Sequence, residues 1–113
     1  MIDALEDEKG ILENSAKYAS SLASADKGTL KSLAAQRNYG ELKFDENGYI
    51  TNYYEYFKNL DDAYNKARTT MSEKELEKFE EWIDEVKEAA DIYEASREKY
   101  EEYIEKLKDT IAE

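Results

Sequence analysis

A long apolar row in the last third of the sequence constrains the fold more than any other feature. Positions that alternate by three and four residues are apolar or aromatic throughout, except at Arg97. The row consists of Leu76, Phe79, Ile83, Val86, Ala90, Tyr93, Tyr100, Ile104, Leu107 and Ile111. Such a repeat is typical of a coiled-coil seam or of a long helix in a helical hairpin. The chain has no proline and Ser72 with Glu75 forms a capping box, so we predict one acidic helix over residues 72–112.

This predicted helix needs a packing partner. Glutamates at four-residue spacing repel one another along it, and Arg97 requires a carboxylate nearby or a solvent-facing turn. The first segment has its own three-four stripe, formed by Ile2, Leu5, Leu12, Ala16, Ala19 and Ala23 and widened by Ile11, Tyr18 and Leu22. We expect residues 1–38 to form a helix, or a kinked helix pair that breaks near residues 24–29. Its preferred arrangement is antiparallel to the long helix.

The middle of the chain lacks this helical periodicity. Asn47-Gly48 between apolar residues predicts a β-hairpin within residues 39–51, because both residues tolerate positive φ. The hairpin residues are Phe44, Asp45, Asn47, Gly48 and Ile50. A short helix is predicted over residues 52–68, with Asn52 as its N-cap and Glu55 as the box partner. The expected fold class is all-α, an elongated helical hairpin or coiled coil with a small β-hairpin insertion between helices, forming one structural unit.

Composition excludes several function classes. The chain has no His and no Cys, which rules out disulfides, zinc fingers, thiol nucleophiles and His-centred triads. Its 16 Lys and Arg against 28 Asp and Glu give a formal charge of −12, which argues against nucleic acids and anionic bilayers as partners. No apolar run is long enough to span a bilayer. We therefore expect no catalytic residues, cofactor or metal, and only protein partners.

Three features of the sequence could form a site, and each also has a structural interpretation. With Gly48 at position 6 of an EF-hand loop, positions 1 and 12 would be Lys43 and Tyr54, so two charged calcium ligands are missing. The acidic residues of the long helix are typical of a solvated face. Tyr54 and Tyr56 lie off the apolar stripe of the short helix, and we identify them as possible partner contacts.

A family resemblance rests on the middle of the chain. The segment Phe44-Asp45-Glu46-Asn47-Gly48-Tyr49-Ile50-Thr51-Asn52-Tyr53, preceded by Tyr39-Gly40, resembles a recurrent F-D-x-x-G-x-I-x-N-Y turn of bacteriophage tail tape-measure proteins. In those proteins the turn lies between helices, and an acidic heptad-rich helix follows. The resemblance covers roughly residues 30–113, although only the turn is specific. It implies a structural segment of a longer virion protein that sets tail length, with self-association or other tail proteins as partners and no catalytic residues.

Two other functions stay open at the level of the sequence. One is a generic coiled-coil scaffold or adaptor, located in the cytoplasm. The other is a small acidic protein that mimics nucleic-acid charge and blocks a basic host protein. The mimic is favoured by residues 72–113, which hold 16 acidic and 7 basic residues. Against it, such a density of charge is ordinary on an exposed helix face.

Overall fold

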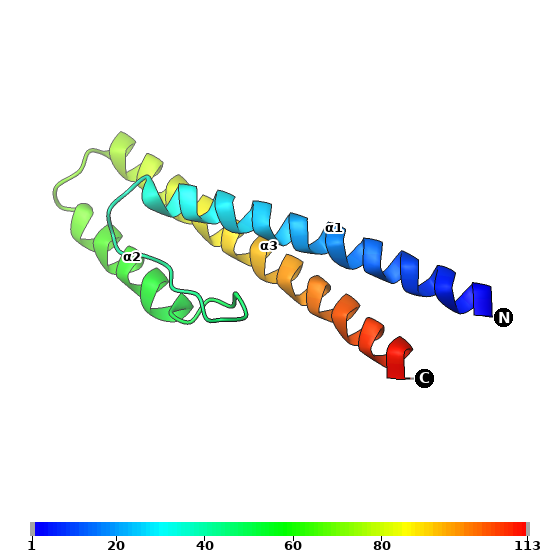
Figure 1. The fold of residues 1–113 in the computed structure, drawn as a ribbon. Coiled ribbons are helices and arrows are strands. Elements are labelled where there is room, and N and C mark those ends of the chain that lie inside the picture. The colour runs from blue at the N-terminus through cyan, green and yellow to red at the C-terminus, as the bar shows by residue number, and fades with distance from the viewer. Residues whose placement is uncertain (1, 113) are drawn as a thin grey trace.

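The protein is an elongated bundle of three helices, as the predicted all-α class requires. The computed structural model describes the backbone of residues 2–112 and the side chains of residues 9–109. The helices are α1 (Ile2–Ala35), α2 (Tyr53–Ala67) and α3 (Glu73–Ala112). The molecule measures 69 × 22 × 14 Å along its principal axes, and Figure 1 shows the two long helices side by side.

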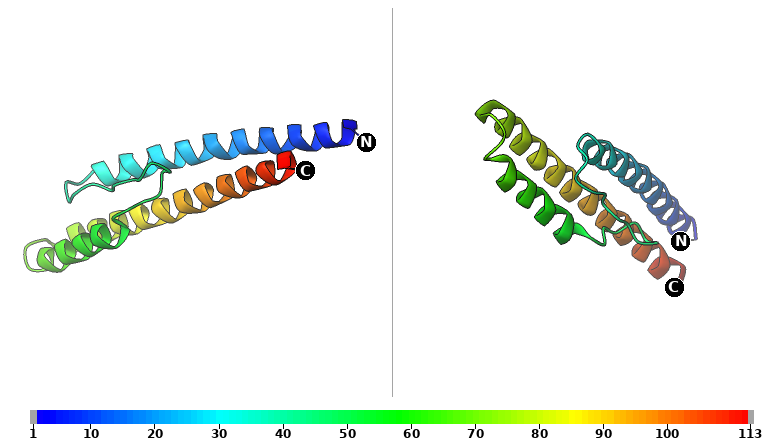
Figure 2. Two further views of the ribbon diagram at one scale, coloured as in Figure 1. Left: turned by 60° about the horizontal axis from the view of Figure 1, so that its bottom comes forward. Right: turned by 90° about the vertical axis from the view of Figure 1, so that its left-hand side faces the viewer.

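The predicted antiparallel pairing of the first and last helices is confirmed. The described ends of α1 and α3 that lie nearest the two termini are at the same end of the molecule in Figures 1 and 2. Helix α3 packs against α1 and also against the shorter α2. The segment that connects α1 to α2 runs back along the bundle before α2 begins (Figure 1). Both neighbours therefore depend on α3.

Helix α1 does not break where the sequence predicted a break. It is continuous through residues 24–29 and ends at Ala35. Gly28 lowers helix propensity by about 1 kcal/mol relative to Ala, which packing along a 34-residue helix can offset. The hydroxyl of Thr29 donates a hydrogen bond to the Ala25 carbonyl oxygen one turn earlier, at 3.1 Å, so this polar residue is accommodated within the helix.

The expected β-hairpin is not formed as a pair of strands. Within the described residues it is reduced to a single antiparallel bridge between Phe44 and Ile50. The Thr51 amide donates to the Lys43 carbonyl oxygen beside this bridge at 2.9 Å. A two-stranded hairpin is only marginally stable by itself, and here the apolar residues of the turn pack against helices instead.

The predicted α3 row forms the centre of the core. Phe79, Ile83, Val86, Ala90 and Tyr93 are buried. Leu76, Tyr100, Ile104 and Leu107 are partly buried, whereas Ile111 lies outside the residues whose side chains are described. Ser72 caps α3 as predicted, because its hydroxyl accepts a hydrogen bond from the Glu75 amide at 3.3 Å.

The predicted stripe of α1 is only partly correct. Ala16, Ala19 and Ala23 are buried and Leu12 is partly buried, while the side chains of Ile2 and Leu5 lie outside the described part. Ile11, Tyr18 and Leu22, which were expected to widen the packed stripe, are exposed. These alanines face α3 together with Leu30, which is fully buried, and their small side chains let the two helices approach closely.

Two polar contacts tie α1 to α3. The indole Nε1 of Trp82 donates to the Leu33 carbonyl oxygen at 2.8 Å, which satisfies a carbonyl near the C-terminal end of α1. Further along the bundle, the hydroxyl of Ser96 donates a hydrogen bond to the Asp26 carboxylate. These contacts set the alignment of the two helices along their shared axis.

Substitution of Phe79 tests how much this core contributes to stability. Its side chain is fully buried and contacts the rings of Tyr39, Tyr64 and Trp82. We expect Phe79→Ala to lower the free energy of unfolding by about 3–5 kcal/mol, from lost burial and the cavity left behind. Urea titration followed by circular dichroism measures this. The exposed Tyr54→Ala is the control, with an expected change within about 0.5 kcal/mol. Equal effects of both substitutions would contradict this assignment of the core.

Candidate functional site

The turn that carries the family resemblance is closed by Asp45. Its carboxylate oxygen Oδ1 accepts hydrogen bonds from the amides of Asn47 and Tyr49, each at 2.9 Å. The amide of Gly48 donates to the Asp45 carbonyl oxygen at 3.0 Å. An Asp side chain that accepts from the backbone two residues on is the common way to fix such a turn. Asp45 therefore has a structural role in this turn.

Gly48 brings the tip of the turn onto α3. Its φ is +86°, in the region that favours glycine. A Cβ atom at this position would lie 2.9 Å from the Tyr93 hydroxyl oxygen. That hydroxyl donates a hydrogen bond to the Gly48 carbonyl oxygen. Glycine is thus required here both by the backbone conformation and by the close approach of α3.

Aromatic rings and one arginine surround this contact. Phe44 lies edge-on to Tyr93, with ring centroids 5.7 Å apart. The Arg97 guanidinium lies 5.4 Å from the Tyr49 ring and 5.1 Å from the Tyr100 ring. Its Nη2 also pairs with the Glu101 carboxylate at 3.0 Å. Arg97, the one charged residue in the apolar row, therefore has the carboxylate partner that the sequence required, and it also packs on the turn.

Asn52 has a different role from the predicted one. Its side chain makes no capping hydrogen bond to α2. Instead, its Oδ1 accepts from the Lys43 amide at 2.8 Å, and its Nδ2 donates to the Glu41 carbonyl oxygen at 2.9 Å. The side-chain amide thus pairs with the backbone as a neighbouring strand would. Residues 41–43 gain strand-like hydrogen bonds in this way without a second strand.

The remaining residues of the turn motif also pack on the helices. Ile50 and Phe44 are half-buried against the core, together with Tyr39 and Leu42. The hydroxyl of Tyr53 donates to the Asp91 carboxylate of α3 at 3.2 Å. The ring of Tyr53 lies against that of Phe57, with centroids 4.6 Å apart. The motif therefore connects α1 to α2 and fixes both ends of this connection on α3.

The structure separates the two tyrosines expected to contact a partner. Tyr54 is 77 % exposed, whereas Tyr56 is 1 % exposed, so the assignment of Tyr56 as a partner contact is wrong. Tyr56 packs edge-on against Phe57 at 5.2 Å between centroids. The rotation of α2 about its own axis, which periodicity alone does not determine, buries one of these residues and exposes the other.

Carboxylates gather where α2 begins. Glu94 lies on α3 near Asp91 and Glu98, and burial together with these two charges raises its pKa. Burial and the neighbouring Asp91 likewise raise the pKa of Tyr53. Among the described residues, however, there is no group of three or more acidic side chains placed to hold a metal ion. These carboxylates repel one another, and the packing of the surrounding helices holds them close together.

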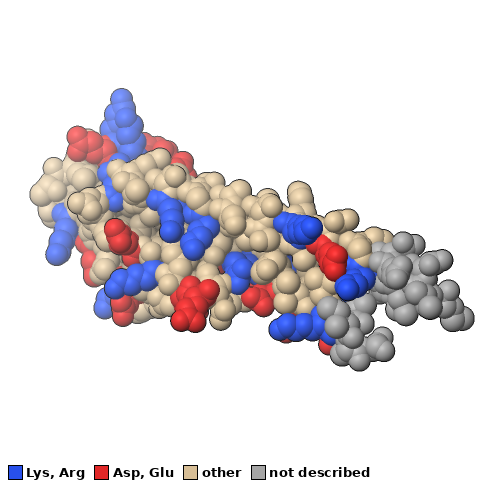
Figure 3. Space-filling model, in the orientation of Figure 1, with Lys and Arg blue, Asp and Glu red and all other residues tan. Residues whose placement is uncertain are grey.

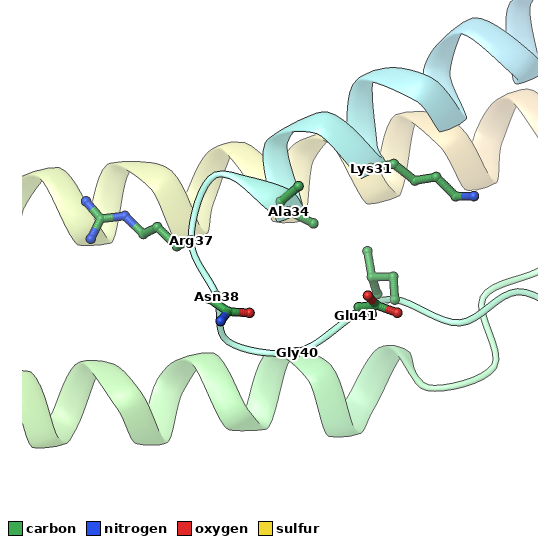
Figure 4. A pocket seen from close by; sticks show the side chains of 8 residues that line it. Lys31, Ala34, Arg37, Asn38, Gly40 and Glu41 are labelled. Carbon is green, nitrogen blue, oxygen red and sulfur yellow. The ribbon is translucent and has the colours of Figure 1, made fainter.

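A small pocket lies at the end of α1. Its volume is about 380 Å³, and it is lined in part by Lys31, Arg37 and Glu41. Figure 4 shows the Lys31 and Arg37 side chains pointing in opposite directions, with Glu41 near the first. The C-terminal carbonyls of α1 also make this region unfavourable for an anion. The pocket therefore has no convergent set of groups for a charged ligand.

A groove between α1 and α3 offers more to a protein partner. Two pockets follow one another along it, and Ile92 lines both. One is bordered by Tyr18, Leu22 and Tyr103, and the other by Leu33 and acidic side chains. The groove lies on the side of the helix pair away from the Phe44 turn, which Lys27 and Lys31 contact from α1. The groove is not predicted by the sequence pattern, because Tyr18 and Leu22 extend the apolar stripe of α1 and were expected to be packed.

Comparison with protein-family models, with curated proteins and with solved structures found no match for this chain. The search of the described residues also found no helix with the length and hydropathy needed to cross a bilayer.

Two glycines allow a matched test of the docked turn. Gly48→Ala places a Cβ against Tyr93 and requires a positive φ, so we expect a loss of at least about 1 kcal/mol in unfolding free energy. Gly28→Ala adds the same methyl group inside α1, where nothing lies within 4 Å. This control should stabilise by about 0.5–1 kcal/mol. Denaturant unfolding measures both, and a loss-free Gly48→Ala would show that the turn is not docked as described.

Glu94 should give a pH-dependent effect. Because the pKa of Glu94 is raised in the folded protein, its ionised carboxylate lowers the free energy of unfolding above that pKa. Below pH 4.5, the ordinary pKa of a glutamate, the carboxyl group is protonated in both states and this destabilisation is lost. We therefore expect Glu94→Gln to stabilise the protein at pH 7 and to lose this advantage near pH ~4. Thermal unfolding at both pH values tests it. The exposed Glu105→Gln is the control, and an equal gain there would assign the effect to net charge alone.

Proposed function

We propose that this chain is a non-catalytic structural module, and more specifically a segment of a bacteriophage tail tape-measure protein located in the virion. The docked turn carries the proposal. In the F-D-x-x-G-x-I-x-N-Y pattern, Asp45 closes the turn, Gly48 permits its contact with α3, and Asn52 binds the preceding backbone. Every one of these roles positions helices. None of them leaves a reactive group directed at a substrate.

The helical architecture suits a mechanical role. A single helix rises 1.5 Å per residue, so 113 residues would extend about 170 Å. The folded module spans 69 Å along its longest axis, because α1 and α3 run antiparallel. A ruler made from such modules would measure distance either by the length of the folded hairpin or by that of a fully extended helix. The two possibilities predict different tail lengths.

A second candidate is a helical adaptor unrelated to phage. It is favoured by the apolar groove, whose exposed side chains Tyr18, Leu22 and Ile92 could dock another protein. A mimic of nucleic-acid charge has less support. On the face seen in Figure 3, Lys and Arg side chains are interspersed with Asp and Glu instead of leaving a continuous acidic surface.

Tail length in the phage that encodes this segment tests the proposal. We expect in-frame deletion of residues 1–113 to shorten the tail, as measured by electron microscopy of negatively stained particles. The shortening should be about 170 Å if the segment is extended in the tail, and close to 69 Å if it keeps the folded length. Asn59→Ala, at an exposed position of α2, is the control and should leave the length unchanged. Particles with tails of unaltered length after the deletion would contradict the tape-measure proposal.

A further inference from the structure

Between residues 10 and 33, one arc of α1 carries no charged residue, although 39 % of the chain is charged. At 100° per residue, this arc is formed between residues 10 and 33 by Gly10, Ile11, Asn14, Ser15, Tyr18, Ser21, Leu22, Ala25, Gly28, Thr29, Ser32 and Leu33. Lys27 and Lys31 lie on the other side and contact Phe44 of the connecting segment, whereas Asp26 lies at the edge of the arc and lines the groove. Solvent-facing helix surfaces normally carry charged or polar residues. This arc is polar in part, but it has no charge and holds four large apolar side chains, Ile11, Tyr18, Leu22 and Leu33.

Large apolar side chains lie exposed on the same arc and across the groove. Ile11 is 66 % exposed, Tyr18 73 % and Leu22 43 %, and Ile92 of α3 is 49 % exposed. Single exposed apolar residues are common, but a contiguous group beside a groove marks an interaction surface. Tyr18, Leu22 and Ile92 line one continuous pocket. We name this surface, formed by the uncharged arc of α1 and the α3 wall of the groove, the open face.

The α3 wall of the open face has an ordered charge pattern. Glu81, Glu85 and Glu88 follow one another at helical spacing before Ile92. Beyond Ile92, the same line continues through Ala95 to Lys99. The wall is thus acidic in one half, apolar at its centre and basic at the start of the other half. An antiparallel copy of this wall would set each lysine opposite a glutamate.

We propose that the open face binds a second copy of this chain about a two-fold axis perpendicular to α3 and close to Ile92 and Ala95. The α3 helices of the two copies then run antiparallel, with Glu88 of each copy beside Lys99 of the other. The uncharged arcs of the two α1 helices face each other, and Asp26, which lines the groove beside the arc, keeps its hydrogen bond from Ser96. The contact is isologous and closes on itself as a dimer.

Other arrangements of two copies fit the charges less well. A two-fold axis parallel to the helices would set the glutamates of each α3 against the uncharged arc of the other copy's α1, leaving them without basic partners. Parallel α3 helices in register would set glutamate against glutamate. The net charge of −12 per copy opposes any dimer, and salt screens that repulsion. Apolar burial therefore supplies affinity, while Glu88 and Lys99 determine orientation.

Charge exchange across the axis tests the proposed arrangement. Sedimentation equilibrium over a concentration series at fixed salt should show a monomer–dimer equilibrium for the wild-type chain. Lys99→Glu sets like charges together at two symmetric places, and so does Glu88→Lys, so each should weaken dimerisation at least about tenfold. The double variant Glu88→Lys/Lys99→Glu restores both opposite-charge pairs and should bring the dissociation constant back to within about threefold of wild type.

Matched substitutions separate the open face from the rest of the surface. Leu22→Asp puts a charge into the apolar contact and should abolish the dimer, whereas Asn59→Asp alters an exposed side chain on α2 and should leave it unchanged. Circular dichroism confirms that each variant is folded. A wild-type chain that stays monomeric at millimolar concentration would overturn the proposal and assign the open face to a different partner. Dimers whose double charge variant is no stronger than the single variants would overturn it as well.

Discussion

The structure depends on the packing of two shorter partners along a single long helix. Helix α3 could not be stable alone, because its acidic side chains repel one another at helical spacing. Helices in proteins gain most of their stability from tertiary contacts. Its buried row, from Phe79 to Tyr93, contacts both α1 and α2. The aromatic residues of this row pack against other rings, Phe79 against Tyr39 and Tyr64 and Tyr93 against Phe44.

The docked turn converts a poorly structured connection into a rigid part of the bundle. Each of its fixed points uses a different kind of interaction: a carboxylate bound to backbone amides at Asp45, a close backbone approach at Gly48, and a side-chain amide at Asn52. Arg97 completes the site from α3 by packing on Tyr49. The residues that carry the family resemblance are therefore the same residues that hold the turn against the helices.

The sequence predicted the parts of the fold that local chemistry determines. The long helix, its Ser72 cap and the reversal at Asn47-Gly48 follow from spacing and turn preferences. The predictions that failed concern residues whose roles depend on neighbours distant in the sequence. Asn52 was expected to cap α2 because nothing in the sequence shows that Glu41 and Lys43 lie beside it. Tyr18 and Leu22 were assigned to the core because periodicity defines an apolar stripe but does not show which of its edges is covered.

The hydrogen bond between Ser96 and Asp26 has a consequence for the uniqueness of the fold. The alanines of α1 have little shape of their own, so their contacts alone would allow α1 to slide along α3 by one helical turn, about 5.4 Å; among the buried side chains of α1, only Leu30 is large. Such a slide would withdraw the Ser96 hydroxyl from the partly buried Asp26 carboxylate and the Trp82 indole from the Leu33 carbonyl. Two polar partners would then be lost together. These two hydrogen bonds, together with the burial of Leu30, therefore select one alignment of α1 along α3.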